Sequence, residues 1–261
     1  MSGQSGHAGD ERSPRSVLAR GLSLLDAFLA GDTELGLAEL ADRSGLPKPT
    51  AHRLLGELVE WGAVERSRPG HYRLAGKLFR LGQLVPRHRQ LRQAALPFLE
   101  ELHATSGENV HLAVPDDGYT LFVEKLSGTE SMVVGSRVGG RMPSHCTATG
   151  KVFLAWGGRE RLRRVVDAGL PRLTPRTIVL PGLLHQDLER TLARGVGINH
   201  EEAEPGVSAV AAPVRGARGE VVAALSVTGC SQRLDVERLG RVVRAAAGAL
   251  SARLPALAAG R

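Results

Sequence analysis

A histidine next to a cysteine, His145-Cys146, is the feature of the sequence that most suggests covalent chemistry. A thiolate activated by an imidazole is a nucleophile, so the pair would suit a cysteine-dependent hydrolase. The pair reads as part of a strand, however, where adjacent side chains point to opposite faces. His145 would then be badly placed to take the thiol proton, and a small buried cysteine is the simpler interpretation. We therefore predict no catalytic residue and no enzymatic activity.

The same segment could instead bind an anion. Cys146–Lys151 is a run of small residues that leads into a predicted helix over Thr149–Ala155. Free backbone N–H groups at a helix N-terminus attract a carboxylate, and small side chains let a ligand approach the backbone closely. Spacing alone leaves a second interpretation equally open, namely a plain helix start capped by threonine hydroxyls.

A second group of chemically active side chains is basic and lies nearer the N-terminus. Lys48, Thr50, His52 and Arg53 stand at the start of a predicted helix, opposite its apolar face. Between residues 43 and 92 there are eleven Lys or Arg against three Glu, whereas the net charge of the whole chain is only +7. Contact with the phosphates of nucleic acid requires positive charge concentrated in this way.

Two predicted helices and a hairpin would position these basic side chains. A short helix with an apolar stripe ends at Ser44-Gly45, where a glycine allows the positive φ of a sharp turn. The second helix has apolar residues at helical spacing, namely Ala51, Leu54, Leu55, Leu58 and Val59. Val64–Leu74 then alternates around a Pro69-Gly70 turn, which is typical of a β-hairpin.

These elements predict a winged helix-turn-helix that reads double-stranded DNA. Its second helix would enter the major groove with its N-terminal residues at the base edges, while the wing would hold phosphates. The alternative is an ordinary amphipathic helix with a charged outer face, but the turn, the wing and the local charge together favour DNA binding. The predicted DNA-binding residues are Lys48, Thr50, His52, Arg53, Arg66, Arg68, His71 and Arg73.

An ordered set of motifs resembles the IclR family of bacterial transcriptional regulators. The similarity begins at Ser16–Leu25 and continues through Gly45–Arg66. It resumes, in the expected order, at Arg141–Ala155, Gly195–Val207 and Ala211–Gly229. The resemblance implies an α+β protein in which a winged helix-turn-helix precedes a GAF-like effector-binding domain, an antiparallel sheet with helices. Such proteins bind palindromic operators as homodimers or homotetramers.

The length of 261 residues suggests two modest domains. We predict a disordered tail at 1–15, the winged helix-turn-helix at 16–76, a linker helix at 77–91 and an effector-binding and oligomerisation domain at 92–261. The first helix is expected to bury Val17, Leu18, Leu22, Leu25 and Leu29. Strands of the second domain are predicted at Val110–Val114, Thr120–Leu126, Met132–Val138, Ala209–Val214 and Val221–Val227.

The resemblance places the loop before Thr149 in the effector pocket, with backbone donors at Ala148 and Thr149. Asn199-His200 stands where many relatives carry acidic residues, and Ala209 where some carry Cys or Ser, so their ligand is not carried across. Ser226 and Thr228 lie two apart on a strand and face one side. The predicted effector-binding residues are Val134, Met142, Cys146, Thr147, Ala148, Thr149, Gly150, Asn199, Val207, Ala209, Ser226 and Thr228.

The remaining features set limits on the class of protein. Cys146 and Cys230 have no paired spacing, which argues against a disulfide scaffold or a zinc site, and no apolar run reaches transmembrane length. We therefore predict a cytoplasmic regulator with no metal, no cofactor and no membrane contact. Its partners would be operator DNA and a small organic acid that carries a carboxylate, with repression favoured over activation. The alternatives are a cysteine-dependent hydrolase and a metabolite-binding module with no role on DNA.

Overall fold

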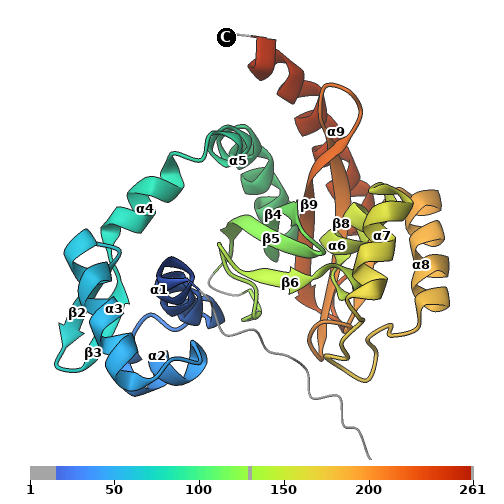
Figure 1. Ribbon diagram of the computed structural model, residues 1–261. Helices are drawn as coiled ribbons and strands as arrows, with labels where there is room; N and C mark the ends of the chain where they lie inside the picture. Colours follow the sequence, from blue (N-terminus) through green and yellow to red (C-terminus); the bar gives the residue numbers. More distant parts are fainter. Residues whose placement is uncertain (1–15, 129–130, 260–261) are drawn as a thin grey trace, which may run out of the picture. The chain divides into compact units, whose positions relative to one another are not determined.

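The computed structural model describes residues 16–128 and 131–259, and it divides into two compact units (Figure 1). The smaller unit extends to Val85 and the larger begins at Pro86. The tail predicted at 1–15 lies outside the described residues. Within residues 77–91, predicted as a linker helix, α4 (Gly76–Gln83) ends before α5 (Pro86–Ser106) begins.

The smaller unit is a winged helix-turn-helix, as predicted. Gly45 forms the turn between its second and third helices with a φ of +66°, a conformation that side chains with a Cβ rarely adopt. The wing strands pair antiparallel in a three-stranded sheet of order β1-β3-β2. Before α4, its elements are α1 (Val17–Asp26), the 3₁₀ helix η1 (Ala27–Ala30), β1 (Leu35–Gly36), α2 (Leu37–Arg43), α3 (Lys48–Trp61), β2 (Val64–Arg68) and β3 (His71–Leu74).

The buried face predicted for the first helix is wrong. Leu24, Ala27 and Phe28 enter the core of the smaller unit, and Leu25 packs against it. The side chains of Val17, Leu18, Leu22 and Leu29 are instead largely exposed. The segment is apolar on two faces, so periodicity alone could not decide which face the core would take.

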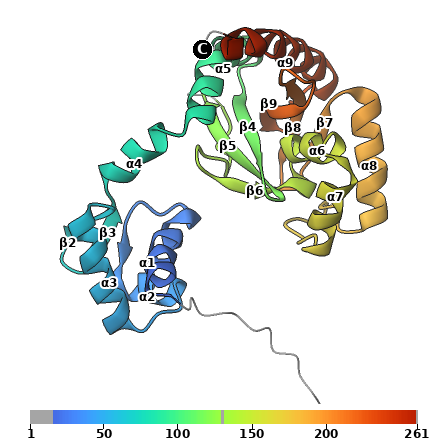
Figure 2. The same ribbon diagram turned by 45° about the horizontal axis from the view of Figure 1, so that its top comes forward.

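The larger unit is built on a six-stranded antiparallel sheet of order β6-β5-β4-β9-β8-β7. Helices α5 and α9 cover one face of the sheet and α6 lies on the other, together with α7 and α8 (Figure 2). After α5, its elements are β4 (Asn109–Asp116), β5 (Tyr119–Leu126), β6 (Arg141–Pro143), the 3₁₀ helix η2 (Ser144–Cys146), α6 (Ala148–Ala155), α7 (Gly158–Asp167), α8 (Pro181–Arg194), β7 (Gly197–His200), β8 (Val207–Arg215), β9 (Val221–Cys230) and α9 (Val236–Ala259).

One predicted strand is absent and two short ones were missed. Met132–Val138 has no regular secondary structure, although its composition is typical of a strand. Side chains from neighbouring strands, rather than a strand ladder, hold its backbone: Asn109 Nδ2 donates to Met132 O and Lys125 Nζ to Ser136 O. The missed strands, β6 and β7, are too short for alternation to reveal them.

Helix α6 approaches the sheet very closely. The sheet face beneath it is made of small side chains, including Ala209, Ala211 and Ala224. At Gly197 of β7, an added Cβ would lie 2.3 Å from the carbonyl oxygen of Ala148, the first residue of α6. The position of the α6 N-terminus therefore depends on the lack of a side chain at residue 197.

We expect Gly197→Ala to destabilise the protein by about 1–3 kcal/mol, because the new methyl group would collide with backbone and displace α6. Gly248→Ala is the matched control, since Gly248 lies in α9 with nothing within 4 Å of an added Cβ. That substitution should stabilise by about 0.5–1 kcal/mol through helix propensity. Urea denaturation measures both, and equal free energies of unfolding for the two variants would contradict the packing argument.

Candidate nucleic-acid interface and ligand pocket

The basic residues of α3 lie on its outer surface. Lys48, His52 and Arg53 are exposed and Thr50 is half-buried, while Ala51 and Leu55 on the opposite side enter the core. Pro49, within the first turn, breaks no intrahelical hydrogen bond there. The side chains predicted to reach base edges are therefore at the start of one exposed helical face.

Several predicted DNA contacts, one at the base edges and two at phosphates, are engaged in surface ion pairs. Arg68 Nε lies 2.6 Å from Glu34 Oε1, Arg73 Nε lies 2.5 Å from Glu65 Oε1, and Arg53 pairs with Glu57. Exposed pairs of this kind contribute only about 0–1 kcal/mol each, so a phosphate can replace the carboxylate. The other predicted wing contacts are the exposed Arg66 and the half-buried His71, whose Nδ1 lies 3.2 Å from Pro69 O.

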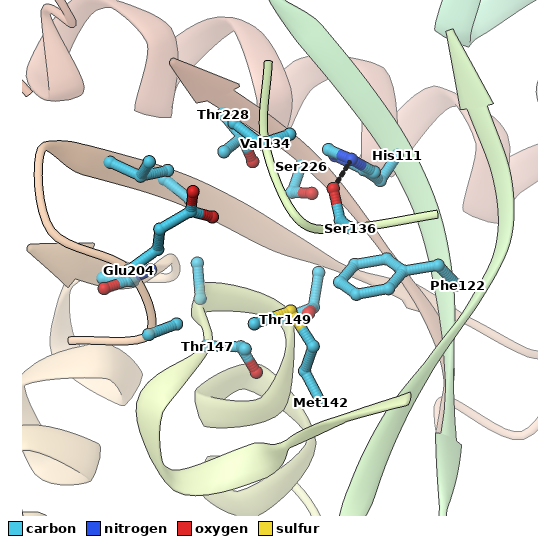
Figure 3. A pocket seen from close by; sticks show the side chains of 15 residues that line it. His111, Phe122, Val134, Ser136, Met142, Thr147, Thr149, Glu204, Ser226 and Thr228 are labelled. Atoms are coloured by element: carbon cyan, nitrogen blue, oxygen red, sulfur yellow. Dashed lines mark hydrogen bonds between the residues drawn. The ribbon is translucent and has the colours of Figure 1, made fainter. Parts of the chain in front are cut away.

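A pocket opens in the larger unit between the N-terminus of α6 and the strands β4, β5, β8 and β9 (Figure 3). Its volume is only about 40 Å³, which is room for about three water molecules. The pocket brings together ten of the twelve predicted effector-binding residues: Val134, Met142, Thr147, Ala148, Thr149, Asn199, Val207, Ala209, Ser226 and Thr228. Cys146 and Gly150 do not line it.

Sequence reasoning missed five lining residues, namely His111, Phe122, Ser136, Ala203 and Glu204. A signal existed for the first of these. His111 lies directly opposite Ser226 in the ladder between β4 and β9, so the two side chains share a face. Strand alternation around a histidine within an apolar run could have identified it.

The floor of the pocket presents backbone donors. Ala148 and Thr149 are the first two residues of α6, whose N–H groups have no intrahelical acceptor. The side chain of the N-cap residue, Thr147, accepts from Gly150 N at 3.2 Å, and no acceptor is found for Ala148 N or Thr149 N among the described residues. Both groups can therefore donate to an anion, which the helix dipole also favours.

His111 supplies an imidazole to the pocket lining. Its Nε2 lies 2.8 Å from Ser136 Oγ, a contact drawn in Figure 3. Burial, reinforced by the charge of Lys125, lowers the pKa of His111 from 6.5 to about 3. The ring is therefore neutral at pH 7, and its buried Nδ1 has no hydrogen-bond partner within the described residues.

The irregular segment Met132–Val138, here called the flap, carries Val134 and Ser136 into the pocket lining. Besides Asn109 and Lys125, the flap is held by Glu204 Oε2, which accepts from Gly135 N at 3.1 Å. The Val133 side chain on the flap is 91% exposed. Four polar contacts, together with the buried side chain of Val134, thus hold the flap over the pocket.

Cys146 has properties opposite to those of a nucleophile. Burial, with a further contribution from Glu202, raises the pKa of its thiol to about 12. The pair His145-Cys146 lies in η2, so the strand geometry used to separate the two side chains was wrong. His145 Nε2 donates to Pro171 O at 3.0 Å, and burial lowers the pKa of this histidine. The structure thus disfavours the thiolate on which a cysteine hydrolase depends.

A winged helix-turn-helix followed by an α+β unit with its own ligand pocket defines a DNA-binding transcriptional regulator. Residues 17–68 match the IclR helix-turn-helix domain, and residues 83–252 match the bacterial transcriptional regulator IclR C-terminal domain. The chain belongs to the IclR family. None of the helices in the described part of the chain combines the length and apolarity that a bilayer crossing requires.

Individual relatives agree with this assignment. The chain is 35% identical to the HTH-type transcriptional regulator XynR of Escherichia coli, over 83% of this chain and 86% of that protein. It is 34% identical to the acetate operon repressor of Salmonella typhimurium, over 88% and 86%. The structure of an IclR homologue from Microbacterium hydrocarbonoxydans, complexed with 4-hydroxybenzoate, superposes with a TM-score of 0.83 at 33% identity, covering 92% of this chain and 99% of that one.

The lowered pKa of His111 predicts a specific pH dependence of stability. Between pH 6.5 and about 3 the unfolded chain binds a proton at this residue and the folded chain does not. Acidification through this window should therefore cost up to about 1.4 kcal/mol per pH unit from this residue. Urea denaturation at several pH values should show that the free energy of unfolding falls less steeply with acidification in His111→Gln than in wild type. Parallel curves below pH 6.5 would show that His111 is not held neutral.

Proposed function

We propose that this protein represses transcription by binding operator DNA through α3 and the wing, and that a small organic acid in the pocket changes its affinity for DNA. We infer the ligand class from the N–H groups of Ala148 and Thr149, which lie at the positive end of α6 on the pocket floor. Such an arrangement favours a carboxylate.

The rest of the pocket suits a modest apolar body. Phe122, Val134, Met142 and Val207 provide apolar surface, while Asn199, Ser226 and Thr228 offer polar contacts to a substituent. A relative of this chain binds 4-hydroxybenzoate, which has one carboxylate on one ring. We propose aromatic and short aliphatic monocarboxylates as the ligand class, with 4-hydroxybenzoate as the first probe.

Entry of such a ligand requires the pocket to expand. A volume of about 40 Å³ holds waters but not an aromatic ring. We propose that the flap moves outward, since polar contacts hold it and water can replace them. Ligand binding would then exchange the contacts of Ser136 and Gly135 for contacts with the acid, and the pocket would change shape between its two states.

We propose that the protein binds DNA as a homodimer or homotetramer. Three large apolar side chains of α1 are exposed, namely Val17, Leu18 and Leu22, and so are Phe79 and Leu81 of α4. A second copy that covered these side chains would remove them from water. Two winged helix-turn-helix units in one assembly would then match the two half-sites of a palindromic operator. We also propose a cytoplasmic location, because the regulator would act on chromosomal DNA.

The DNA contacts can be separated by two arginine substitutions. Arg53→Ala should cost about 1–3 kcal/mol of operator binding and relax the sequence preference, because Arg53 would contact base edges. Arg68→Ala should weaken binding to all sequences alike and reduce the salt slope by about one, because Arg68 would hold a phosphate. Fluorescence anisotropy with labelled operator and scrambled DNA measures both effects.

The matched control for these variants is Arg163→Ala, which removes an exposed arginine from α7 in the larger unit and should leave DNA affinity unchanged. If the Arg53→Ala, Arg68→Ala double variant folds and still binds operator as wild type does, the proposed reading surface is wrong.

Thr149 offers a direct test of the charge of the ligand. Thr149→Asp would place a carboxylate at the α6 N-terminus, where two like charges about 4 Å apart repel by about 4 kcal/mol at an effective dielectric constant of about 20. Calorimetry should therefore show at least a tenfold loss of 4-hydroxybenzoate affinity, together with loss of its effect on DNA binding. Thr149→Asn has the same size without the charge and should bind far more tightly than Thr149→Asp. Equal affinities in the two variants would refute a carboxylate at this position.

A further inference from the structure

A second and much larger cavity, of about 540 Å³, lies between α7, the turn from β4 to β5, and the segment from β6 to η2. It shares no lining residue with the pocket described above. The two are nevertheless neighbours along the chain, because Pro143 and His145 line the larger cavity while Met142 and Thr147 line the smaller one. One short segment therefore separates two distinct sites.

Two arginines of α7, Arg161 and Arg164, line this larger cavity. Among the described residues, neither guanidinium has a hydrogen bond or an ion pair. Arg163 on the same helix behaves differently, because it does not line the cavity and its Nε lies 3.4 Å from Asp167 Oδ2. Burial, reinforced by the charge of Arg164, lowers the pKa of Arg161. The two cations are thus close enough to repel each other.

The other polar groups of the cavity do not neutralise this charge. Asp117, in the turn from β4 to β5, is the one carboxylate in the lining and forms no ion pair within the described part of the chain. Burial lowers the pKa of His145, and its Nε2 already donates to Pro171 O. Within the described residues, the partly buried Arg161 and the exposed Arg164 thus both have unused N–H donors, and an anion in the cavity would supply their acceptor.

We propose that this cavity is a second ligand site, which binds a small multivalent oxyanion through Arg161 and Arg164. Each guanidinium presents a fork of N–H donors that matches two oxygens of a phosphate or a carboxylate. A doubly charged group between the two arginines would neutralise both and remove their repulsion. The ligand class comprises phosphate monoesters and small di- or tricarboxylates, in contrast to the single carboxylate proposed for the pocket at α6.

Calorimetry on the full chain in a low-chloride buffer tests this site, with inorganic phosphate, glycerol phosphate and citrate as separate probes. Wild type should bind at least one of them saturably, with one site per chain. Arg161→Met keeps the apolar stem but removes the charge, and should weaken binding at least tenfold. Arg164→Met, at an exposed position, should also weaken it, whereas Arg163→Met is the matched control and should bind as wild type does.

Binding of the phosphates alone would identify a phosphate monoester site, and binding of citrate alone a polycarboxylate site. Without ligand, Arg161→Met should unfold at a urea concentration no lower than wild type, because the lost guanidinium makes no ion pair. The proposal is overturned if wild type binds none of the probes at concentrations up to about 10 mM. Equal binding by Arg161→Met and Arg163→Met would also overturn it. Titration with 4-hydroxybenzoate reports on the other pocket independently.

Discussion

The larger unit depends on the burial of one charged side chain. Lys151 of α6 is only 1% exposed, and its Nζ lies 2.5 Å from Glu202 Oε1 and 2.7 Å from Asp187 Oδ2. Burial raises the pKa of Glu202 while Lys151 opposes that rise. Removal of either partner from a buried pair typically costs about 3–5 kcal/mol, because the remaining charge stays uncompensated. The triad thus holds together α6, α8 and the loop after β7. Glu202 N also donates to Asn199 Oδ1 at 2.8 Å, so a pocket residue is fixed by the same cluster.

Periodicity and motif order were sufficient for most of the architecture. The strands β4, β5, β8 and β9 are runs rich in β-branched and apolar residues, with turn residues between β4 and β5 and between β8 and β9, a pattern visible without coordinates. The winged helix-turn-helix was recognisable from two features of the sequence. Gly45 allows the positive φ of the turn, and the apolar residues at helical spacing in α3 end just before Gly62. Ten predicted residues meet in one pocket because they lie on elements whose order the family motifs define.

The failures have physical causes that a sequence does not display. The flap reads as a strand, but Asn109, Lys125 and Glu204 take its backbone groups and leave no ladder to form. The first helix is apolar on two faces, so its sequence pattern does not show which face is buried. Packing against the rest of the core buries Leu24 and leaves Leu22 exposed. The role of Lys151 could not be foreseen, since a lysine in a helix is usually exposed. Its partners come from segments more than thirty residues away in the chain.

We propose that a carboxylate bound at the N-terminus of α6 is the signal to which the regulator responds. A crystal structure of the full chain with 4-hydroxybenzoate tests this most directly. We expect the carboxylate oxygens to accept from Ala148 N and Thr149 N, with the flap displaced from its contacts with Lys125 and Glu204. A complex in which the acid binds outside this pocket, or binds within it with its carboxylate away from α6, would show that the α6 N-terminus does not recognise the carboxylate.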